Sequence, residues 1–276
     1  MTTIICLGPK ACDIGEAHEV LSEPLKIKLI DLDIEGDNCY SISPQKTPED
    51  YENNTPDLSA FLADIDDEIL FIVTGECEVA SCSLKILQQI KHKEITVVYL
   101  VPHKDFLTTR QLMQERVVRN VLQEYARSGL FKNIILLDSQ LLESVMPPSS
   151  IKNFDSQFNL TVLNLLRTYR NIQNFESLID HSNKPKDVSR MITFAYYDLE
   201  SDSERTVYNM EMVDDKIYHF FLTEASLNSD SKMLREIKDK LKNKAVDITK
   251  ISYTIDSTIT EANFCFVVYH SKLIQP

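Results

Sequence analysis

Short apolar runs alternate with helical patterns along the first half of the chain, and this alternation restricts the fold more than any other feature. The runs are rich in Ile, Leu and Val, which is typical of strands that are covered on both faces of a sheet. They span residues 3–7, 26–32, 69–74, 95–101 and 133–138. Because helical patterns separate them, the sequence predicts an α/β fold with a parallel, doubly wound sheet.

Two of the intervening segments, 78–92 and 107–128, are predicted to be helices. In the second, apolar residues at helical spacing form one face, which predicts an amphipathic helix. These residues are Met113, Val117, Val121, Leu122 and Tyr125. Thr108 or Thr109 can cap the start of this helix, and Gly129 follows where a helix would stop.

The second half of the chain has a different pattern. A long helix is predicted at about 155–175, with an apolar stripe of Phe158, Val162, Leu165, Leu166, Tyr169 and Ile172. Predicted strands follow at 190–197, 206–213, 217–222, 249–256 and 263–270, with a helix at 231–243. The last two strands have the pattern of neighbours that a polar turn joins. We therefore expect a Rossmann-like domain at 1–154, a connecting helix at 155–180 and a smaller α+β domain at 181–276.

The chain is acidic, with a formal net charge of −13 and a pI near 4.9. Nucleic-acid phosphates would be repelled, so we expect no nucleic-acid partner. Because the sequence shows neither a membrane-length apolar run nor a signal-peptide pattern, we expect a cytoplasmic protein without a membrane partner. The absence of Trp and the frequent Asn, Ile and Lys are compatible with an AT-rich genome. For a viral protein the location would be the host cytoplasm or the virion.

Segment 35–66 is polar, acidic and interrupted by proline. It is predicted to be a surface excursion with a short helix near its end. Acidic residues alternate at 31–37, but the other ligands of a calcium-binding loop are missing.

Glycine is scarce, with 5 residues in 276, whereas an average protein has about 7%. The stretch LFIVTGECEVASCSLKIL, from Leu70 to Leu87, nevertheless has the outline of a phosphate-binding turn, since an apolar strand, Gly75 and a helical segment follow one another. Phosphate-binding turns use glycine because it allows a ligand to approach the backbone closely. Here Glu76 and Glu78 would instead repel phosphate, so a triphosphate is expected to bind poorly without a cation.

The order of elements, a nucleotide-fold half, a long helix and a smaller α+β half, resembles the tubulin/FtsZ superfamily over nearly the whole chain. In that family glycine-rich turns follow the first strand and a later core strand. The corresponding stretches here are GPKACD, which keeps Gly8 and has Asp13 in place of an amide, and GECEVAS, which keeps Gly75.

Further family positions fall on single residues of this chain. Pro102 and Arg110 match a strand end and an arginine near the ribose, while Phe106 stands where the family has a glutamate. Asp138 occupies the place of an asparagine at a strand end, and Asn159 is in register with the asparagine that reads guanine. The resemblance thus implies a cofactor-binding set of Gly8, Asp13, Gly75, Arg110, Asp138 and Asn159.

The catalytic loop of the family, NxDxxD, corresponds to Ser182, Lys184 and Asp187. One carboxylate is kept and a lysine replaces the other, and a charged lysine cannot accept a proton from water. We therefore expect a structural protein that is not an enzyme, has no required cofactor, and acts through self-association or a protein partner. The alternative is a divergent protein that binds and hydrolyses GTP and forms filaments.

Other chemistries find little support in the sequence. The six cysteines show no metal-binding spacing and are expected to be buried or half-buried thiols, and the six histidines show none either. His103 follows Pro102, but no motif links it to a nucleophile. No GxSxG, GxxxxGK[ST], HExxH or GxGxxG motif is present. Two further alternatives are an enzyme in which Mg²⁺ bridges Glu76, Glu78 and a nucleotide, and an α/β enzyme unrelated to tubulin.

Overall fold

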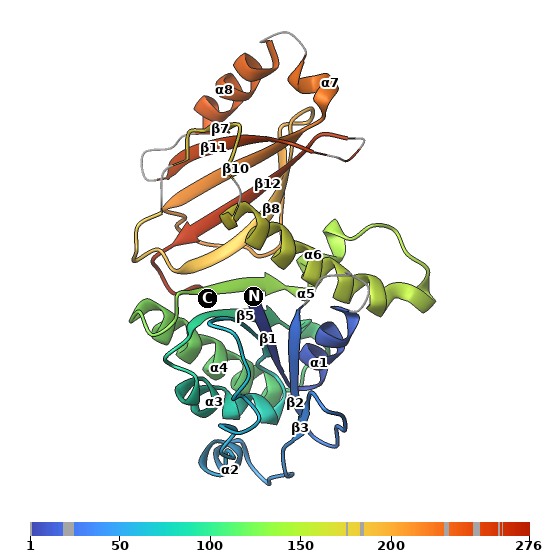
Figure 1. Ribbon diagram of the computed structural model, residues 1–276, viewed down its shortest axis with the longest axis vertical. Helices are drawn as coiled ribbons and strands as arrows, with labels where there is room; N and C mark the ends of the chain where they lie inside the picture. Colours follow the sequence, from blue (N-terminus) through green and yellow to red (C-terminus); the bar gives the residue numbers. More distant parts are fainter. Residues whose placement is uncertain are drawn as a thin grey trace.

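The computed structural model describes residues 2–18, 25–174, 176–182, 185–228, 232–244, 249–258, 260 and 262–276. Figure 1 shows an elongated molecule with two halves. The N-terminal half, blue to green, lies below, the C-terminal half, yellow to red, lies above, and helix α6 (Phe154–Asn174) runs between them. The predicted architecture, a parallel half, a long helix and a smaller α+β half, is confirmed.

Parallel strands in the order β3-β2-β1-β4-β5-β6 form the sheet of the N-terminal half. Their bounds are Thr2–Leu7 for β1, Lys26–Asp31 for β2, Cys39–Ser41 for β3, Glu68–Thr74 for β4, Glu94–Val101 for β5 and Asn133–Asp138 for β6. The five apolar runs are thus confirmed as strands. Chains this apolar are stable as strands only when both faces of the sheet are covered.

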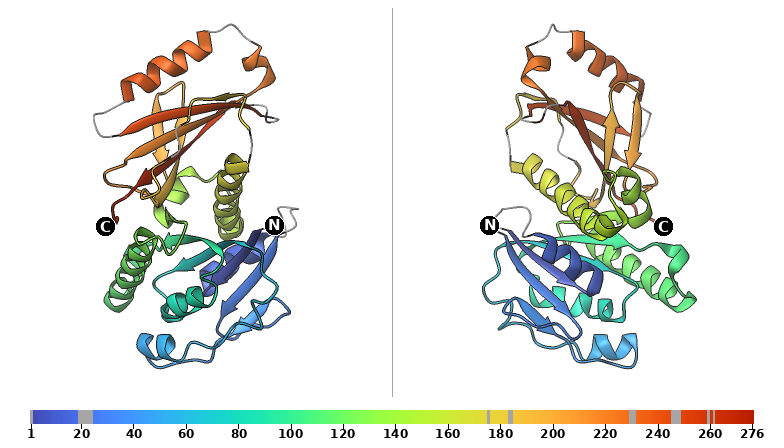
Figure 2. Two further views of the ribbon diagram at one scale, coloured as in Figure 1. Left: turned by 60° about the vertical axis from the view of Figure 1, so that its left-hand side comes forward. Right: turned by 90° about the vertical axis from the view of Figure 1, so that its right-hand side faces the viewer.

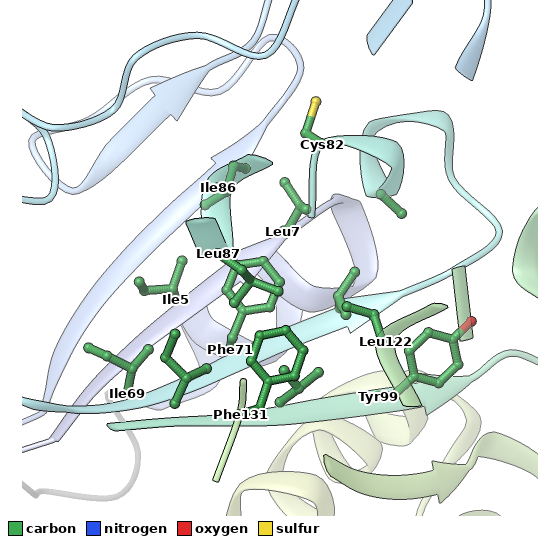
Figure 3. Packing of buried hydrophobic residues seen from close by; sticks show 14 of the residues in the cluster. Ile5, Leu7, Ile69, Phe71, Cys82, Ile86, Leu87, Tyr99, Leu122 and Phe131 are labelled. Atoms are coloured by element: carbon green, nitrogen blue, oxygen red, sulfur yellow. The ribbon is translucent and has the colours of Figure 1, made fainter. Parts of the chain in front are cut away.

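Helices cover both faces of this sheet. Side chains from α1 (Pro9–Glu16), α5 (Ser139–Val145) and α6 pack on one face. The other face is covered by the 3₁₀ helix η2 (Glu78–Cys82), α3 (Ser83–Gln89) and α4 (Thr109–Arg127). Figure 3 shows the core on this second face, with strand residues such as Phe71 packed against side chains of α3 and α4. Covering both faces in this way defines the doubly wound arrangement.

The predicted free thiols and the predicted ends of α4 agree with the structure. The six cysteines are free; Cys6, Cys12, Cys82 and Cys265 are buried and the other two are half-buried. Thr108 caps α4 by accepting a hydrogen bond from the backbone N–H of Gln111, and Gly129 lies beyond its end with a φ of 86°.

The C-terminal half continues the same sheet. Strand β8 pairs in parallel with β6 through two residue pairs, Ile134 with Met191 and Ile135 with Ile192, and the order then runs β8-β12-β10-β11-β7. The bounds are Ile179–Asp180 for β7, Met191–Asp198 for β8, Ser203–Thr206 for β9, Asp215–Leu222 for β10, Glu224–Leu227 for α7, Lys232–Lys244 for α8, Lys250–Ser257 for β11 and Phe264–Ser271 for β12.

Three local predictions for the strands and loops are wrong. The last two strands are not neighbours, because β10 lies between β11 and β12 and pairs with both. A strand was expected at 206–213, but β9 ends at Thr206 and the chain then turns, so that the Tyr208 hydroxyl donates to the carbonyl of Pro276. In segment 35–66 the helix α2 (Pro48–Asn53) lies in the middle, where Thr47 caps it.

The predicted apolar face of α4 is wrong in its direction for most of its residues, although Leu122 is buried and Val121 is half-buried. Met113, Val117 and Tyr125 are exposed, whereas the polar residues Glu115, Arg119 and Gln123 are at most 4% exposed. The buried polar side chains have partners that lie elsewhere in the chain. Arg119 pairs with Glu115 at 2.7 Å, and its guanidinium also donates to Tyr208 and to the carbonyls of Gln275 and Pro276. These contacts hold the polar face inward, since breaking them would leave a buried charge unpaired.

Candidate functional site

A cavity of about 280 Å³ lies at the carboxyl ends of the parallel strands. Residues that line it include Thr74 at the end of β4, Pro102 and His103 after β5, and Lys10 after β1. The strand order reverses here, because β2 lies on one side of β1 and β4 on the other. In doubly wound sheets, ligands bind in the crevice at such a switch point.

Three helices begin at this cavity. Lys10 is the second residue of α1, Ser139 is the first of α5, and Phe154 and Asp155 are the first two of α6, and all four line the cavity. Gly8 precedes α1 with a φ of 90° and supplies no side-chain cap. The Asp138 side chain occupies the first N–H groups of α5. The first N–H groups of a helix lack internal partners and carry a partial positive charge, so α1 and α6 favour a polar or anionic ligand.

Apart from an interaction between the Thr74 and Glu76 side chains, three buried polar atoms of the lining residues have no hydrogen-bond partner within the described part of the chain. They are Thr74 Oγ1, Glu76 Oε2 and His103 Nδ1. Burial raises the pKa of the Glu76 carboxyl. Buried polar atoms are nearly always paired, so three unpaired ones in one cavity indicate room for a ligand that carries hydrogen-bond donors, or for a cation.

The charges around the cavity are mixed. Lys10 Nζ lies 3.7 Å from the carboxylate of Asp155 and 4.7 Å from the ring centroid of Phe158. Glu76 and Glu143 also line the cavity. Three carboxyl groups therefore face one lysine, and a phosphate group would need a cation beside Glu76. No group of three or more His, Cys, Asp and Glu side chains in the described part of the chain could hold a metal ion by itself.

The two glycines of the predicted site lie in loops that touch one another. A Cβ atom built on Gly8 would lie 2.7 Å from Cys77 Sγ, which belongs to the loop that begins with Gly75. A Cβ atom on Gly75 would lie 2.0 Å from the hydroxyl of Tyr99. Glycine at 75 is therefore required by the packing of this loop on β5, independently of any ligand.

None of the six predicted site residues is among those that line the cavity. Asn159 donates from its side chain to the carbonyl of Asp13 at 3.1 Å, which joins α6 to α1, and its own Oδ1 is buried without a partner among the described residues. Asp138 caps α5 by accepting from the N–H groups of Gln140 and Leu141. Arg110 forms an ion pair with Glu78 at 2.7 Å. The role of all six residues in ligand binding stays a prediction.

The structure adds lining residues that the sequence reasoning missed. Lys10, Glu143, Phe154 and Phe158 were not among the predicted site residues, although they line the cavity. The signal for Lys10 was its position just after the first strand, next to the glycine that begins α1. Phe158 was assigned only to the apolar stripe of α6. Glu143 had no signal in the sequence, because its place depends on how α5 packs.

A second cavity, of about 600 Å³, lies at the other end of β6. Ser182 and Asp187 of the predicted catalytic loop line it, together with Lys132, His219 and His270. Lys184 lies outside the described residues. Lys132 precedes β6 and Ser139 follows it, so the two cavities open at opposite edges of the sheet.

The two histidines in the second cavity predict a loss of stability in mild acid. Burial lowers the pKa of His219 and of His270 to about 4, although the neighbouring Asp180 opposes the shift of His219. Because the folded pKa lies below the unfolded value of about 6.5, the stabilising contribution is complete above that pH and is lost as the pH falls toward about 4. We expect the free energy of unfolding to fall by about 1 kcal/mol per pH unit for each histidine over this window.

Urea unfolding between about pH 7 and pH 5 measures this effect. His219→Gln should flatten the dependence on pH, whereas the exposed His92 provides a matched control, His92→Gln, that should leave it unchanged. A wild-type stability that does not change over this range would contradict the prediction.

Comparison with known proteins identifies the fold. No family model matches the sequence, and no curated protein matches it. Solved structures do match. CetZ from Methanosaeta thermophila is 13% identical with a TM-score of 0.68, over 99% of this chain and 86% of CetZ. The GTPγS-form protofilament of TubZ from Bacillus thuringiensis serovar israelensis is 12% identical with a TM-score of 0.70, over 100% of this chain and 87% of TubZ.

The FtsZ dimer of M. jannaschii, solved empty, is 10% identical with a TM-score of 0.60, over 98% of this chain and 87% of FtsZ. The chain therefore has the tubulin/FtsZ fold, and the predicted resemblance is confirmed at the level of the fold. None of the helices that the structure describes has both the length and the apolar character needed to cross a bilayer.

These matches correct the prediction that the chain is not an enzyme. TubZ with this fold was solved in a GTPγS form and in a GDP form, and CetZ2 from Haloferax volcanii was solved as a GTPγS-bound protofilament. The prediction rested on missing glycines and on Lys184, whereas neighbours with nucleotide-bound forms share the fold at 9 to 12% identity. The absence of those motifs therefore does not exclude a GTPase.

Proposed function

We propose that the chain is a tubulin-like assembly protein that binds and hydrolyses a guanine nucleotide and associates head to tail with further copies of itself. The observation that supports this proposal best is the cavity at the switch point, where three helices begin and three buried polar atoms lack partners. The protofilaments of TubZ and CetZ2, which share the fold, support the mode of assembly.

Lys10 would contact the phosphates directly, and Glu76 would bind them through a cation. Lys10 lies at the start of α1, where a phosphate group would also meet free backbone N–H groups. Glu76 would hold Mg²⁺ shared with the phosphates, since Mg²⁺ is usually bound by one or two carboxylates together with phosphate oxygens. A bound cation would also satisfy Glu76 Oε2, which has no partner in the described structure. Nucleotide binding should therefore depend on the divalent cation.

The opposite positions of the two cavities suit a catalytic site shared between copies. Asp187 lies at the second cavity, at the edge of the sheet remote from Lys10. Head-to-tail stacking would bring this segment of one copy to the nucleotide of the next. There the Asp187 carboxylate would accept the proton of the attacking water.

A second candidate is assembly that needs no nucleotide. It is favoured by the excess of carboxyl groups at the cavity and by the loop from Gly75 to Ser81, in which one glycine remains. In this case the chain would be a structural component that docks on itself or on a protein partner. The two candidates make opposite predictions for titrations with GTP.

Calorimetry with GTP, GDP and ATP, each with and without Mg²⁺, tests the nucleotide. We expect heat with GTP and GDP in the presence of Mg²⁺. Lys10→Ala should weaken binding about tenfold, because a charged hydrogen bond to phosphate contributes about 1.5 kcal/mol or more. Lys104→Ala is the matched control, since Lys104 is exposed and does not line the cavity. No heat with any nucleotide would refute nucleotide binding and leave the second candidate.

Sedimentation of the protein with and without GTP tests assembly. We expect pelleting that increases with GTP and Mg²⁺, and phosphate release that falls in Asp187→Ala while binding is kept. A monomer under every condition would refute self-assembly in both candidates and leave only docking on a protein partner. Pelleting to the same extent with and without GTP would support the second candidate.

A further inference from the structure

The outer surface of α4 carries an apolar ridge. Met113, Val117, Val121 and Tyr125 follow one another at intervals of four residues, and we call these four side chains the α4 ridge. Met113 is 67% exposed, Val117 is 61% exposed and Tyr125 is 39% exposed, whereas Val121 is half-buried. In both views of Figure 2, α4 runs along the outside of the N-terminal half. Apolar side chains in a continuous row on a surface mark an interaction site.

The fold cannot bury this ridge by turning the helix. The opposite side of α4 holds Gln114, Arg119 and Gln123, whose side chains bond to the carbonyl of Cys77 and to the C-terminal segment. Rotation would bring these polar groups into water and break their contacts. The ridge is therefore left for contact with another molecule.

The charges beside the ridge show which molecule fits. Arg116 and Glu124 are exposed on either side of Val121, toward the start and the end of the helix. Glu124 pairs with Arg127 at 2.5 Å, whereas the described residues provide no ion-pair partner for Arg116. If a second α4 lies antiparallel with a two-fold axis between Asn120 and Val121, Arg116 of each copy comes near Glu124 of the other. The same axis places Val117 beside Tyr125.

The spacing of the ridge fits the same arrangement. Rows of residues at intervals of four form ridges inclined to the helix axis, and two such ridges interdigitate at a crossing angle of about −50°, the commonest in globular proteins. A two-fold axis makes both partners present the same surface, so one helix must supply both charges of each pair. The α4 ridge meets that requirement.

We propose that α4 is a contact surface for a second copy of this chain, packed antiparallel about a two-fold axis beside Val121. One helix pair buries less than the roughly 1,000 Å² of a stable interface, so the contact is weak between monomers. Along two head-to-tail assemblies the contacts would add, which makes the surface suited to pairing filaments laterally. The pairing does not depend on nucleotide.

Sedimentation velocity without nucleotide tests the charge pairs, at protein concentrations from about 10 μM to 1 mM. We expect a reversible dimer in the upper part of this range. Arg116→Glu and Glu124→Arg should each weaken dimerisation at least about tenfold through repulsion of like charges, and the double variant should restore it. A wild-type monomer throughout the range, or a double variant as weak as the single ones, would overturn the proposal.

Cross-linking tests the position of the axis. Asn120 is exposed and adjoins Val121, so Asn120→Cys should form a disulfide-linked dimer on mild oxidation, because the two-fold axis brings the two residues close. Lys91→Cys, at an exposed position beyond α3, is the control and should not cross-link above the wild-type level. Equal cross-linking of the two variants would place the contact elsewhere and refute the proposed axis.

Discussion

Gly75→Ala is expected to destabilise the protein by about 3 kcal/mol or more, the upper range for an atom inserted into a packed core. The new Cβ would lie 2.0 Å from the Tyr99 hydroxyl and 3.0 Å from the Cα of Glu115. Neither neighbour can move aside easily. Tyr99 is completely buried, and its hydroxyl donates toward the backbone and carboxylate oxygens of Glu115. Figure 3 shows this hydroxyl directed away from the aliphatic core, toward the edge of the cluster.

Urea unfolding of a double-mutant cycle checks the cause. Tyr99→Phe removes the oxygen that the Cβ would strike, so Gly75→Ala should cost less in that background than in the wild type. The relief should be partial, because the ring carbon that bears the hydroxyl is 3.0 Å from the same Cβ position. Strictly additive costs would show that the steric conflict is not with Tyr99.

Arg119→Met is the second substitution with a large expected effect, about 3 to 5 kcal/mol of lost stability. Arg119 and Glu115 are 4% and 2% exposed, so removing the guanidinium leaves a buried carboxylate without its counter-charge. Arg119 also donates to the carbonyl of Gln275 at 3.4 Å. Thermal or urea unfolding measures the loss, and hydrogen exchange at the C-terminal segment should rise with it.

Arg127→Met on the same helix is the matched control. Arg127 pairs with Glu124 at 2.5 Å, but both side chains are about half exposed, and exposed pairs contribute about 0 to 1 kcal/mol. Similar costs for the two substitutions would show that the burial of Arg119 is not what makes its contacts important.

The fold of the N-terminal half could be predicted because its strands are encoded locally. Runs such as 69–74 are apolar at every position, and Thr108 and Gly129 mark the ends of α4 directly. The direction of α4 could not be predicted in the same way. Its polar face finds partners at Tyr99, Tyr208 and Gln275, and the last two lie far along the chain. The pattern within the helix contains no information about them.

The same distinction applies to the candidate site. The turns at Gly8 and Gly75 could be found from the sequence, because glycine and strand ends are local signals. Phe158 and Glu143 reach the cavity only through the packing of α6 and α5 on the sheet. The prediction that the last two strands are neighbours was wrong for a similar reason. Strand β10, from an earlier part of the chain, lies between β11 and β12. Motifs identify turns, whereas a cavity depends on tertiary packing.

The contact between Gln123 of α4 and Gln275 affects how the chain folds during its synthesis. Gln123 and Gln275 are 152 residues apart and bond to each other through both side chain and backbone. At about 5 to 20 residues per second, a ribosome needs about 8 to 30 seconds to make the intervening chain. During that interval the nascent N-terminal half carries polar side chains that have no partners. It therefore reaches its final packing only after the segment with Gln275 has been made, which gives molecular chaperones a defined period in which to bind it.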